Sequence, residues 1–163
     1  MAAPHIDPAA VLPRSEWETT LRQTTVEVFS IMVGVTVTTP EEVTPPVQGQ
    51  MTGVVGIAGA VRATFSLRCS PQSAIKLASQ MLGVAPDDPD AQKAAADAVG
   101  EICNVVAGHF KAKIGLGEKC MLSLPAILTG RDYRIHFGAA VERMEFPLLF
   151  ESEPVWITLD IRP

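Results

Sequence analysis

Four residues with polar or very small side chains recur at helical spacing between positions 97 and 108. Asp97, Glu101, Asn104 and Gly108 follow one another at intervals of four, three and four residues. An α-helix places residues at this spacing on one narrow stripe, while the apolar residues between them point to other faces. A carboxylate accepts hydrogen bonds, and an amide both accepts and donates them without titrating. The stripe could therefore orient a polar partner, or it could be an ordinary solvated helix face.

Two glycines, Gly100 and Gly108, lie inside the same predicted helix. Glycine weakens a helix interior by about 1 kcal/mol relative to alanine, so two of them require a physical reason. Close packing of a neighbouring element is one reason, and close docking of a partner molecule is the other. The spacing alone leaves both open.

The composition describes one globular, mildly acidic domain. The 163 residues are 47% hydrophobic and 19% charged, and the formal net charge is −5. This charge provides no basic field that could hold nucleic acid or an anionic membrane surface. The uncharged stretch 43–61 contains prolines and several glycines, which argues against a membrane-spanning helix. We therefore expect no nucleic-acid or membrane partner.

The cysteines and histidines do not form the pattern of a disulfide framework or a metal site. Cys69, Cys103 and Cys120 are odd in number and lack CxxC spacing, which indicates reduced, buried thiols in a cytoplasmic protein. The three histidines share no ligand spacing with cysteines or acidic residues, so no bound metal is expected.

The hydrophobic periodicity predicts an α+β fold in which a mostly antiparallel β-sheet packs with long helices. The order of helices and strands contains no βαβ repeat, which argues against a parallel doubly wound sheet. A capping box at Ser15 and Glu18 indicates where the first helix begins. Alternating residues from Val61 to Leu67 predict a strand with one solvated face. The expected helices cover 16–33, 71–83 and 89–113, and the expected strands 35–38, 51–58, 61–67, 121–129, 133–137 and 155–161.

The remaining segments are interpreted as connections around a single domain. Residues 1–14 are expected to form a loose N-terminal leader, because they carry neither the basic nor the apolar region of a signal peptide. The proline-bearing stretch 40–50 is expected to be a surface loop. One domain then covers residues 15–163.

A partial repeat of the polar stripe occurs in the first predicted helix. Residues 27–34 share the frame of residues 101–108, with Glu27 matching Glu101 and Ser30 standing where Asn104 stands. Both copies lie on a long predicted helix that strand segments follow. The repeat indicates an internally duplicated fold.

The order Asp97, Glu101, Asn104 and then Pro125 resembles the signature of the CheC/CheX family of chemotaxis phosphatases. The resemblance extends over most of the chain, from about residue 15 to 162, and includes the segments 28–35 and 52–67. It implies a CheC-like fold, a cytoplasmic location and a role in two-component signalling. The implied activity is hydrolysis of the aspartyl phosphate on a CheY-type response regulator.

The resemblance also implies a role for each residue of the stripe. Asn104 would orient the attacking water, and Glu101 would dock against the active-site lysine of the regulator. Asp97, Gly100 and Gly108 would be secondary docking residues. Mg²⁺ is expected in the site of the partner regulator, and this chain is expected to bind no cofactor itself.

The first-helix copy departs from the family pattern, because the hydroxyl of Ser30 is shorter than an asparagine side chain. We expect this copy to be inactive. A single intact motif favours the CheX type, which implies a homodimer rather than a complex with the deamidase CheD. The alternative is a non-catalytic CheC-like module that docks or sequesters a response regulator or a flagellar-switch component. A purely structural dimerisation domain would leave the motif and its glycines unexplained.

Overall fold

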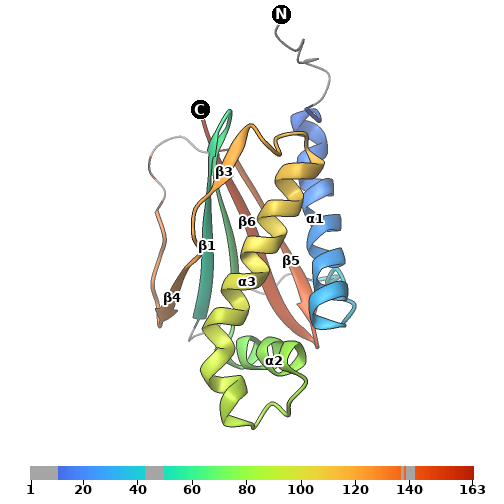
Figure 1. Ribbon diagram of the computed structural model, residues 1–163, viewed down its shortest axis with the longest axis vertical. Helices are drawn as coiled ribbons and strands as arrows, with labels where there is room; N and C mark the ends of the chain where they lie inside the picture. Colours follow the sequence, from blue (N-terminus) through green and yellow to red (C-terminus); the bar gives the residue numbers. More distant parts are fainter. Residues whose placement is uncertain (1–10, 43–49, 137, 139–141) are drawn as a thin grey trace, which may run out of the picture.

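The structure, a computed structural model, describes residues 11–42, 50–136, 138 and 142–163. Within these residues three α-helices pack with one antiparallel sheet (Figure 1), which confirms the predicted α+β class. None of the described helices is long and apolar enough to cross a membrane. The helices are α1 (Trp17–Val28), α2 (Pro71–Leu82) and α3 (Pro89–Lys113), and the strands are β1 (Gln50–Gly59), β2 (Arg62–Cys69), β3 (Cys120–Leu122), β4 (Ala126–Gly130), β5 (Glu142–Phe150) and β6 (Glu153–Arg162).

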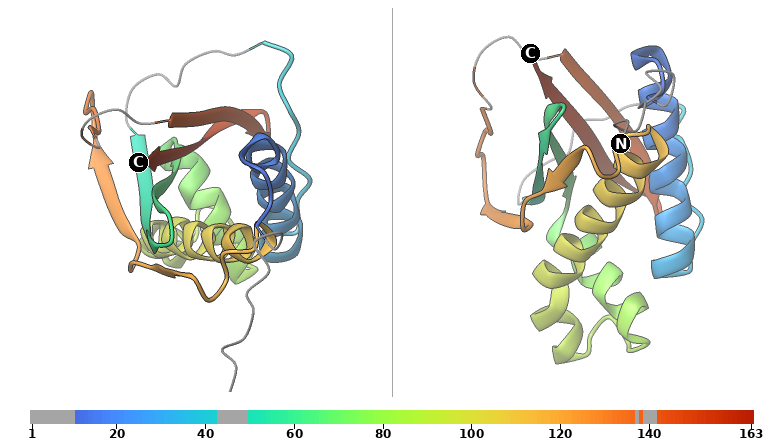
Figure 2. Two further views of the ribbon diagram at one scale, coloured as in Figure 1. Left: turned by 90° about the horizontal axis from the view of Figure 1, so that it is seen from above. Right: turned by 45° about the horizontal axis from the view of Figure 1, so that its top comes forward.

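The sheet curves around the helices (Figure 2) and has the strand order β3-β1-β2-β6-β5. Strand β4 also pairs with β1, so β3 and β4 occupy successive parts of the same edge of that strand. Every strand pair is antiparallel. The internal duplication is not tested by this topology and stays a prediction.

The ends of α2 and α3 form where the sequence predicts them. The Ser70 side chain accepts a hydrogen bond from the backbone N–H of Ser73, and Gly83 ends α2 with a positive φ of 68°. The Asp88 carboxylate accepts the N–H of Asp90 at 2.8 Å, and Pro89 occupies the first turn of α3. These are the side chains that satisfy the free N–H groups at a helix start.

The beginning of α1 differs from the prediction. No side-chain cap bond forms there, and a 3₁₀ turn, Arg14–Glu16, leads into the helix instead of a capping box at Ser15. A π-helical turn, Phe29–Val33, continues α1 as far as the predicted stop at Gly34. Leu12 donates a backbone hydrogen bond to Ile114, so the described part of the expected leader is attached to the domain. Residues 1–10 and 43–49, which belong to the expected leader and loop, lie outside the described residues.

Several predicted strands need correction. The segment 121–129 is two strands, because Pro125 has no N–H to donate and the chain bends at 123–125. Residues 133–136 form no strand, and Phe137 lies outside the described residues. The segment 35–38 contributes only an isolated bridge from Thr38 to Leu149. Strand β5 was not predicted, since it contains Pro147, which has no backbone N–H to donate. The proline is tolerated because β5 lies at the sheet edge.

The sheet face opposite the helices is polar but not solvated, contrary to the prediction. Thr64, Ser66, Thr158 and Asp160 lie on this face and are each at most 9% exposed. The Arg143 guanidinium covers Asp160 and donates to its carboxylate at 2.6 Å and 3.2 Å. Long charged side chains thus shield a polar row that the alternation pattern alone assigns to water.

Helix α3 lies directly on β1 because Gly53 has no side chain. A Cβ at Gly53 would lie 2.5 Å from the Cys103 Sγ and 3.0 Å from a methyl group of Val99. Cys103, Val99, Ile102 and Val106 are all fully buried. The face of α3 that carries them is therefore the one that faces the core.

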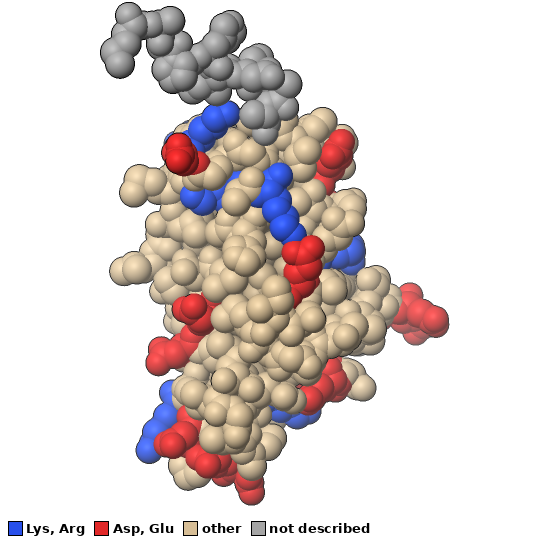
Figure 3. Space-filling model, turned by 45° about the vertical axis from the view of Figure 1, so that its right-hand side comes forward, with Lys and Arg blue, Asp and Glu red and all other residues tan. Residues whose placement is uncertain are grey.

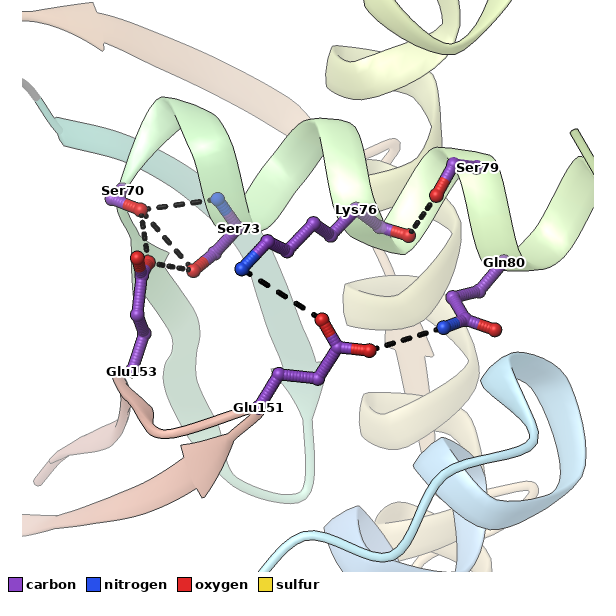
Figure 4. Close-up of polar contacts among 7 residues, drawn as sticks. All are labelled: Ser70, Ser73, Lys76, Ser79, Gln80, Glu151 and Glu153. Atoms are coloured by element: carbon purple, nitrogen blue, oxygen red, sulfur yellow. Dashed lines mark hydrogen bonds and ion pairs between the residues drawn. The ribbon is translucent and has the colours of Figure 1, made fainter. Parts of the chain in front are cut away.

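Helix α2 is attached to the turn between β5 and β6 by a polar network (Figure 4). Ser70 and Ser73 each donate a hydrogen bond to the Glu153 carboxylate, at 2.7 Å and 2.6 Å. In the same turn Glu151 accepts a hydrogen bond from Gln80 and lies 3.7 Å from the Lys76 ammonium. Glu151 and Ser152 both have positive φ, as the two central residues of a type I′ hairpin turn do. These contacts hold α2 across one end of the sheet.

We predict that Gly53→Ala destabilises the protein by about 1–3 kcal/mol, because the new methyl group overlaps a packed core. Urea denaturation measures the change. The matched control is Gly100→Ala, whose added Cβ meets its nearest neighbours at an ordinary 3.5 Å. That control should keep wild-type stability or gain up to about 1 kcal/mol from helix propensity. Equal destabilisation of both variants would contradict the packing described for β1.

We predict that Glu153 makes stability depend on pH. Hydrogen bonds from Ser73 and Ser70 lower the pKa of Glu153 below its ordinary value. A carboxyl group whose folded pKa is lowered stabilises the protein above its unfolded pKa, and that stabilisation disappears as the pH falls through the folded pKa.

Glu153→Gln should therefore be less stable than wild type at neutral pH, and the difference should shrink below about pH 4. Urea midpoints measured across this range test the expectation, with the exposed Glu118→Gln as the control. A constant difference between Glu153→Gln and wild type at every pH would show that the serine contacts do not hold the carboxylate.

Candidate functional site

The stripe predicted on α3 faces outward in the folded chain. Asp97 and Glu101 are exposed, and Asn104 and Gly108 are half-buried. The opposite side of the helix is occupied by the buried residues that contact β1. The four stripe residues are thus brought together on one accessible surface, as the helical spacing predicts.

The polar side chains of this stripe point away from the domain. Among the described residues, no hydrogen bond or ion pair engages the side chains of Asp97, Glu101 or Asn104. They are nevertheless carried by a 25-residue helix whose other faces pack against α1, α2 and the sheet. An amide and a carboxylate are therefore held one turn apart on a rigid support, with their hydrogen-bonding capacity available to another molecule.

Gly100 lies under the bend between β3 and β4. It is buried, and a Cβ at this position would meet Pro125 and Ile127 at 3.5 Å. Gly108 is half-buried, with Leu122 3.7 Å from its Cβ position. Packing of the β3–β4 segment accounts for Gly100 without a docked partner, while docking roles for both glycines stay predictions.

Two residues that the sequence analysis did not select hold Pro125 in place. The backbone N–H of Gly56 donates to the Ser123 hydroxyl at 2.8 Å, and the N–H of Ser123 donates to the Gly56 carbonyl at 2.8 Å. This pair of bonds attaches the bend to β1. No local pattern reveals it, because the two residues are 67 positions apart.

The first-helix copy occupies a different environment. Glu27 forms an ion pair with Lys113 at the end of α3, so its carboxylate already has a partner. Ser30 is exposed but lies in the wide π-helical turn. The copy therefore differs from the α3 stripe in three ways: its carboxylate is paired, its helix geometry is wider, and Ser30 has a shorter side chain than Asn104.

The cysteines lie in the core. All three are buried and free, as predicted. Burial raises the pKa of the Cys69 thiol to about 12, and it raises the pKa of Cys103 further. Thiols in this state are poor nucleophiles at neutral pH, so the chemistry of the site cannot come from Cys103, although it is close to Asn104 in sequence.

No group of three or more histidine, cysteine, aspartate or glutamate side chains that could hold a metal ion occurs in the part of the chain that the structure describes. The hydrogen-bonding side chains of the stripe on α3 are the carboxylates of Asp97 and Glu101 and the amide of Asn104. Such a set can orient a reactant and complement a cation.

The chain resembles known chemotaxis proteins over most of its length. The profile of the family described as chemotaxis phosphatase CheX matches residues 51–149. A curated relative, the CheY-P phosphatase CheX of Thermotoga maritima, is 26% identical over 101 residues. That match covers 61% of this chain and 64% of the relative, slightly less than two thirds of the length of the relative.

Solved structures share the fold at lower identity. A chemotaxis protein CheX from Desulfovibrio desulfuricans superposes with a TM-score of 0.75 at 22% identity, covering 90% of this chain and 99% of the other. The CheX-CheY-BeF₃-Mg²⁺ complex from Borrelia burgdorferi gives a TM-score of 0.72 at 20% identity, covering 92% of this chain and all of the matched chain.

Proposed function

Because the chain belongs to the CheX family of chemotaxis phosphatases, we propose that it hydrolyses the aspartyl phosphate of a CheY-type response regulator. The curated relative from Thermotoga maritima carries the name of this activity, and the similar Borrelia burgdorferi protein was solved in complex with CheY. The observation in this chain that carries the proposal is the pair formed by the exposed Glu101 and the half-buried Asn104 on the outer face of α3, whose side chains have no partner among the described residues.

In the proposed reaction a water molecule attacks the phosphorus atom opposite the aspartyl oxygen. The bond between phosphorus and that oxygen breaks, and the products are the free regulator carboxylate and inorganic phosphate. Such phosphoryl transfer needs little covalent help and depends on placing the nucleophile and neutralising charge. The regulator supplies the phosphorylated aspartate, Mg²⁺ and a lysine, so this chain needs to add only an orienting group.

Asn104 is the proposed orienting group. Its amide accepts one hydrogen bond from the water and donates another, which fixes the direction of the attacking lone pair. Glu101 lies one turn earlier on the helix and docks against the cationic lysine of the regulator. Asp97, further along the same stripe, supports docking through its charge. The rigid attachment of α3 to β1 lets these groups enter the regulator site together.

We propose that the active form is a homodimer, as the single intact motif indicates. The first-helix copy is proposed to be inactive, since Glu27 is paired with Lys113 and Ser30 is too short. Each subunit would then act on a regulator through its own α3.

Asn104→Ala should slow assisted hydrolysis by roughly 30- to 1000-fold, because it removes one positioning group worth about 2–4 kcal/mol in the transition state. Glu101→Ala should weaken regulator binding and lower turnover. Release of inorganic phosphate from the phosphorylated regulator, with this protein present in substoichiometric amount, measures both effects.

The matched control for these variants is His109→Ala, an exposed change on the same helix that lies off the stripe. It should keep wild-type turnover. Equal acceleration by wild type and Asn104→Ala would refute the assignment, and binding without turnover by the wild type would favour the non-catalytic module.

Sedimentation equilibrium of the purified protein should give twice the mass of the 17.4 kDa chain. The measurement covers a range of protein concentrations, because the dissociation of a dimer depends on concentration. A single species of monomer mass at every concentration would contradict the proposed homodimer while leaving the phosphatase proposal standing.

A further inference from the structure

An open groove runs between α2 and α3, next to the outward stripe. Its α2 side is formed by Ala78, Met81 and Leu82, and its α3 side by Ala94 and Ala98. The groove has a volume of about 350 Å³. The short side chains of the alanines leave space between the two helices, so a side chain from another molecule has room to enter.

The groove exposes the apolar side chain of Leu82 to solvent. Leu82 is 52% exposed, although it ends a helix whose other apolar residues are largely buried. Isolated exposed leucines are common, but Leu82 borders a concave apolar surface. A recessed apolar surface with a polar rim is typical of the centre of a protein–protein contact.

The rim of the groove is acidic. Asp97 and Glu101 line its α3 side and have no partner among the described residues. Lys93, which lines an adjoining hollow with Leu82 and Asp97, lies 3.9 Å from Asp90 in an exposed ion pair. Figure 3 shows several acidic side chains, with basic ones among them, at the lower end of the molecule, where Figure 1 places α2 and the start of α3. An occupant with a positive charge beside an apolar side chain would complement both features.

The wall formed by α2 is fixed in position. Glu153 is bonded to Ser70 and Ser73 at the start of the helix, and Glu151 contacts Lys76 and Gln80 along its side (Figure 4). Helix α3 is in turn held against β1. The groove is therefore preformed, which lowers the cost of ordering side chains on binding.

We propose that this groove is a second docking site for the phosphorylated response regulator, which inserts an apolar side chain flanked by a lysine or arginine. The inference rests on the proposed function, because Glu101 belongs both to the groove rim and to the proposed catalytic pair. The groove sets affinity and the choice of regulator, whereas Asn104 sets the rate of hydrolysis. Leu82 separates these two roles, because it lies in the groove and outside the stripe of α3.

The substrate for the test is chosen from the CheY-type regulators of the same genome, as the one that the wild-type protein dephosphorylates fastest. The test measures kcat and KM for this regulator. Leu82→Ser should raise KM about fivefold or more and leave kcat close to wild type, since it removes binding shared by ground and transition states. Asp97→Lys changes the acidic rim that the groove shares with the stripe, and it should raise KM as well. Titration calorimetry with the beryllofluoride-activated regulator and Mg²⁺ should show affinity weakened by a similar factor.

Matched controls lie at the far end of the molecule. Met121→Ser removes an apolar side chain that is 78% exposed on β3, and Glu118→Lys makes the same charge change as Asp97→Lys after the end of α3. Both should keep wild-type KM and affinity. Thermal unfolding of every variant confirms that each one folds.

The outcomes distinguish the two proposals. If Asn104→Ala lowers kcat while Leu82→Ser keeps wild-type KM and affinity, the groove inference is overturned and the phosphatase function stands, whatever Asp97→Lys does. It is also overturned if Leu82→Ser changes the oligomeric state rather than KM, because the groove would then bind a second copy of this chain. If wild type accelerates hydrolysis for none of the regulators, the phosphatase proposal fails and the groove inference falls with it.

Discussion

The close approach of α3 to β1 at Gly53 is the contact on which the rest of the structure depends. With no side chain at Gly53, the thiol of Cys103 and a methyl group of Val99 can reach the strand backbone. This contact decides which face of α3 is buried, and so which residues face outward. A rotation of the helix by one residue would move Glu101 and Asn104 away from the accessible surface.

The helix is also held from its other sides. Trp17 of α1 meets Phe110 edge to face with ring centroids 5.8 Å apart, and the pairing of Lys113 with Glu27 adds a polar contact at the same end. At the opposite end α2 is tied to the β5–β6 turn. A site that works by placing an amide and a carboxylate gains from such support, because small displacements cost much of the effect of orientation.

The features predicted successfully from the sequence are those that local chemistry decides. The stripe on α3 follows from helical spacing, and the limits of α2 and α3 follow from Ser70, Gly83 and Asp88, whose roles involve neighbours in sequence. The errors have two causes. The break at Pro125 comes from the missing N–H of the proline, which hydrophobic alternation does not show. The shielded polar sheet face depends on Arg143, which is 17 positions from Asp160. The family resemblance, rather than the spacing, associated the stripe with a reaction.

The interruption of the sheet edge has a consequence for solubility. An edge strand offers unpaired N–H and C=O groups to other chains and so promotes aggregation. Here β3 and β4 are three and five residues long, and Pro125 between them has no N–H to offer. The neighbouring Leu124 is 89% exposed, and in an uninterrupted edge strand it would favour pairing with a strand of another molecule. The same bend that packs over Gly100 therefore also limits self-association of the sheet edge.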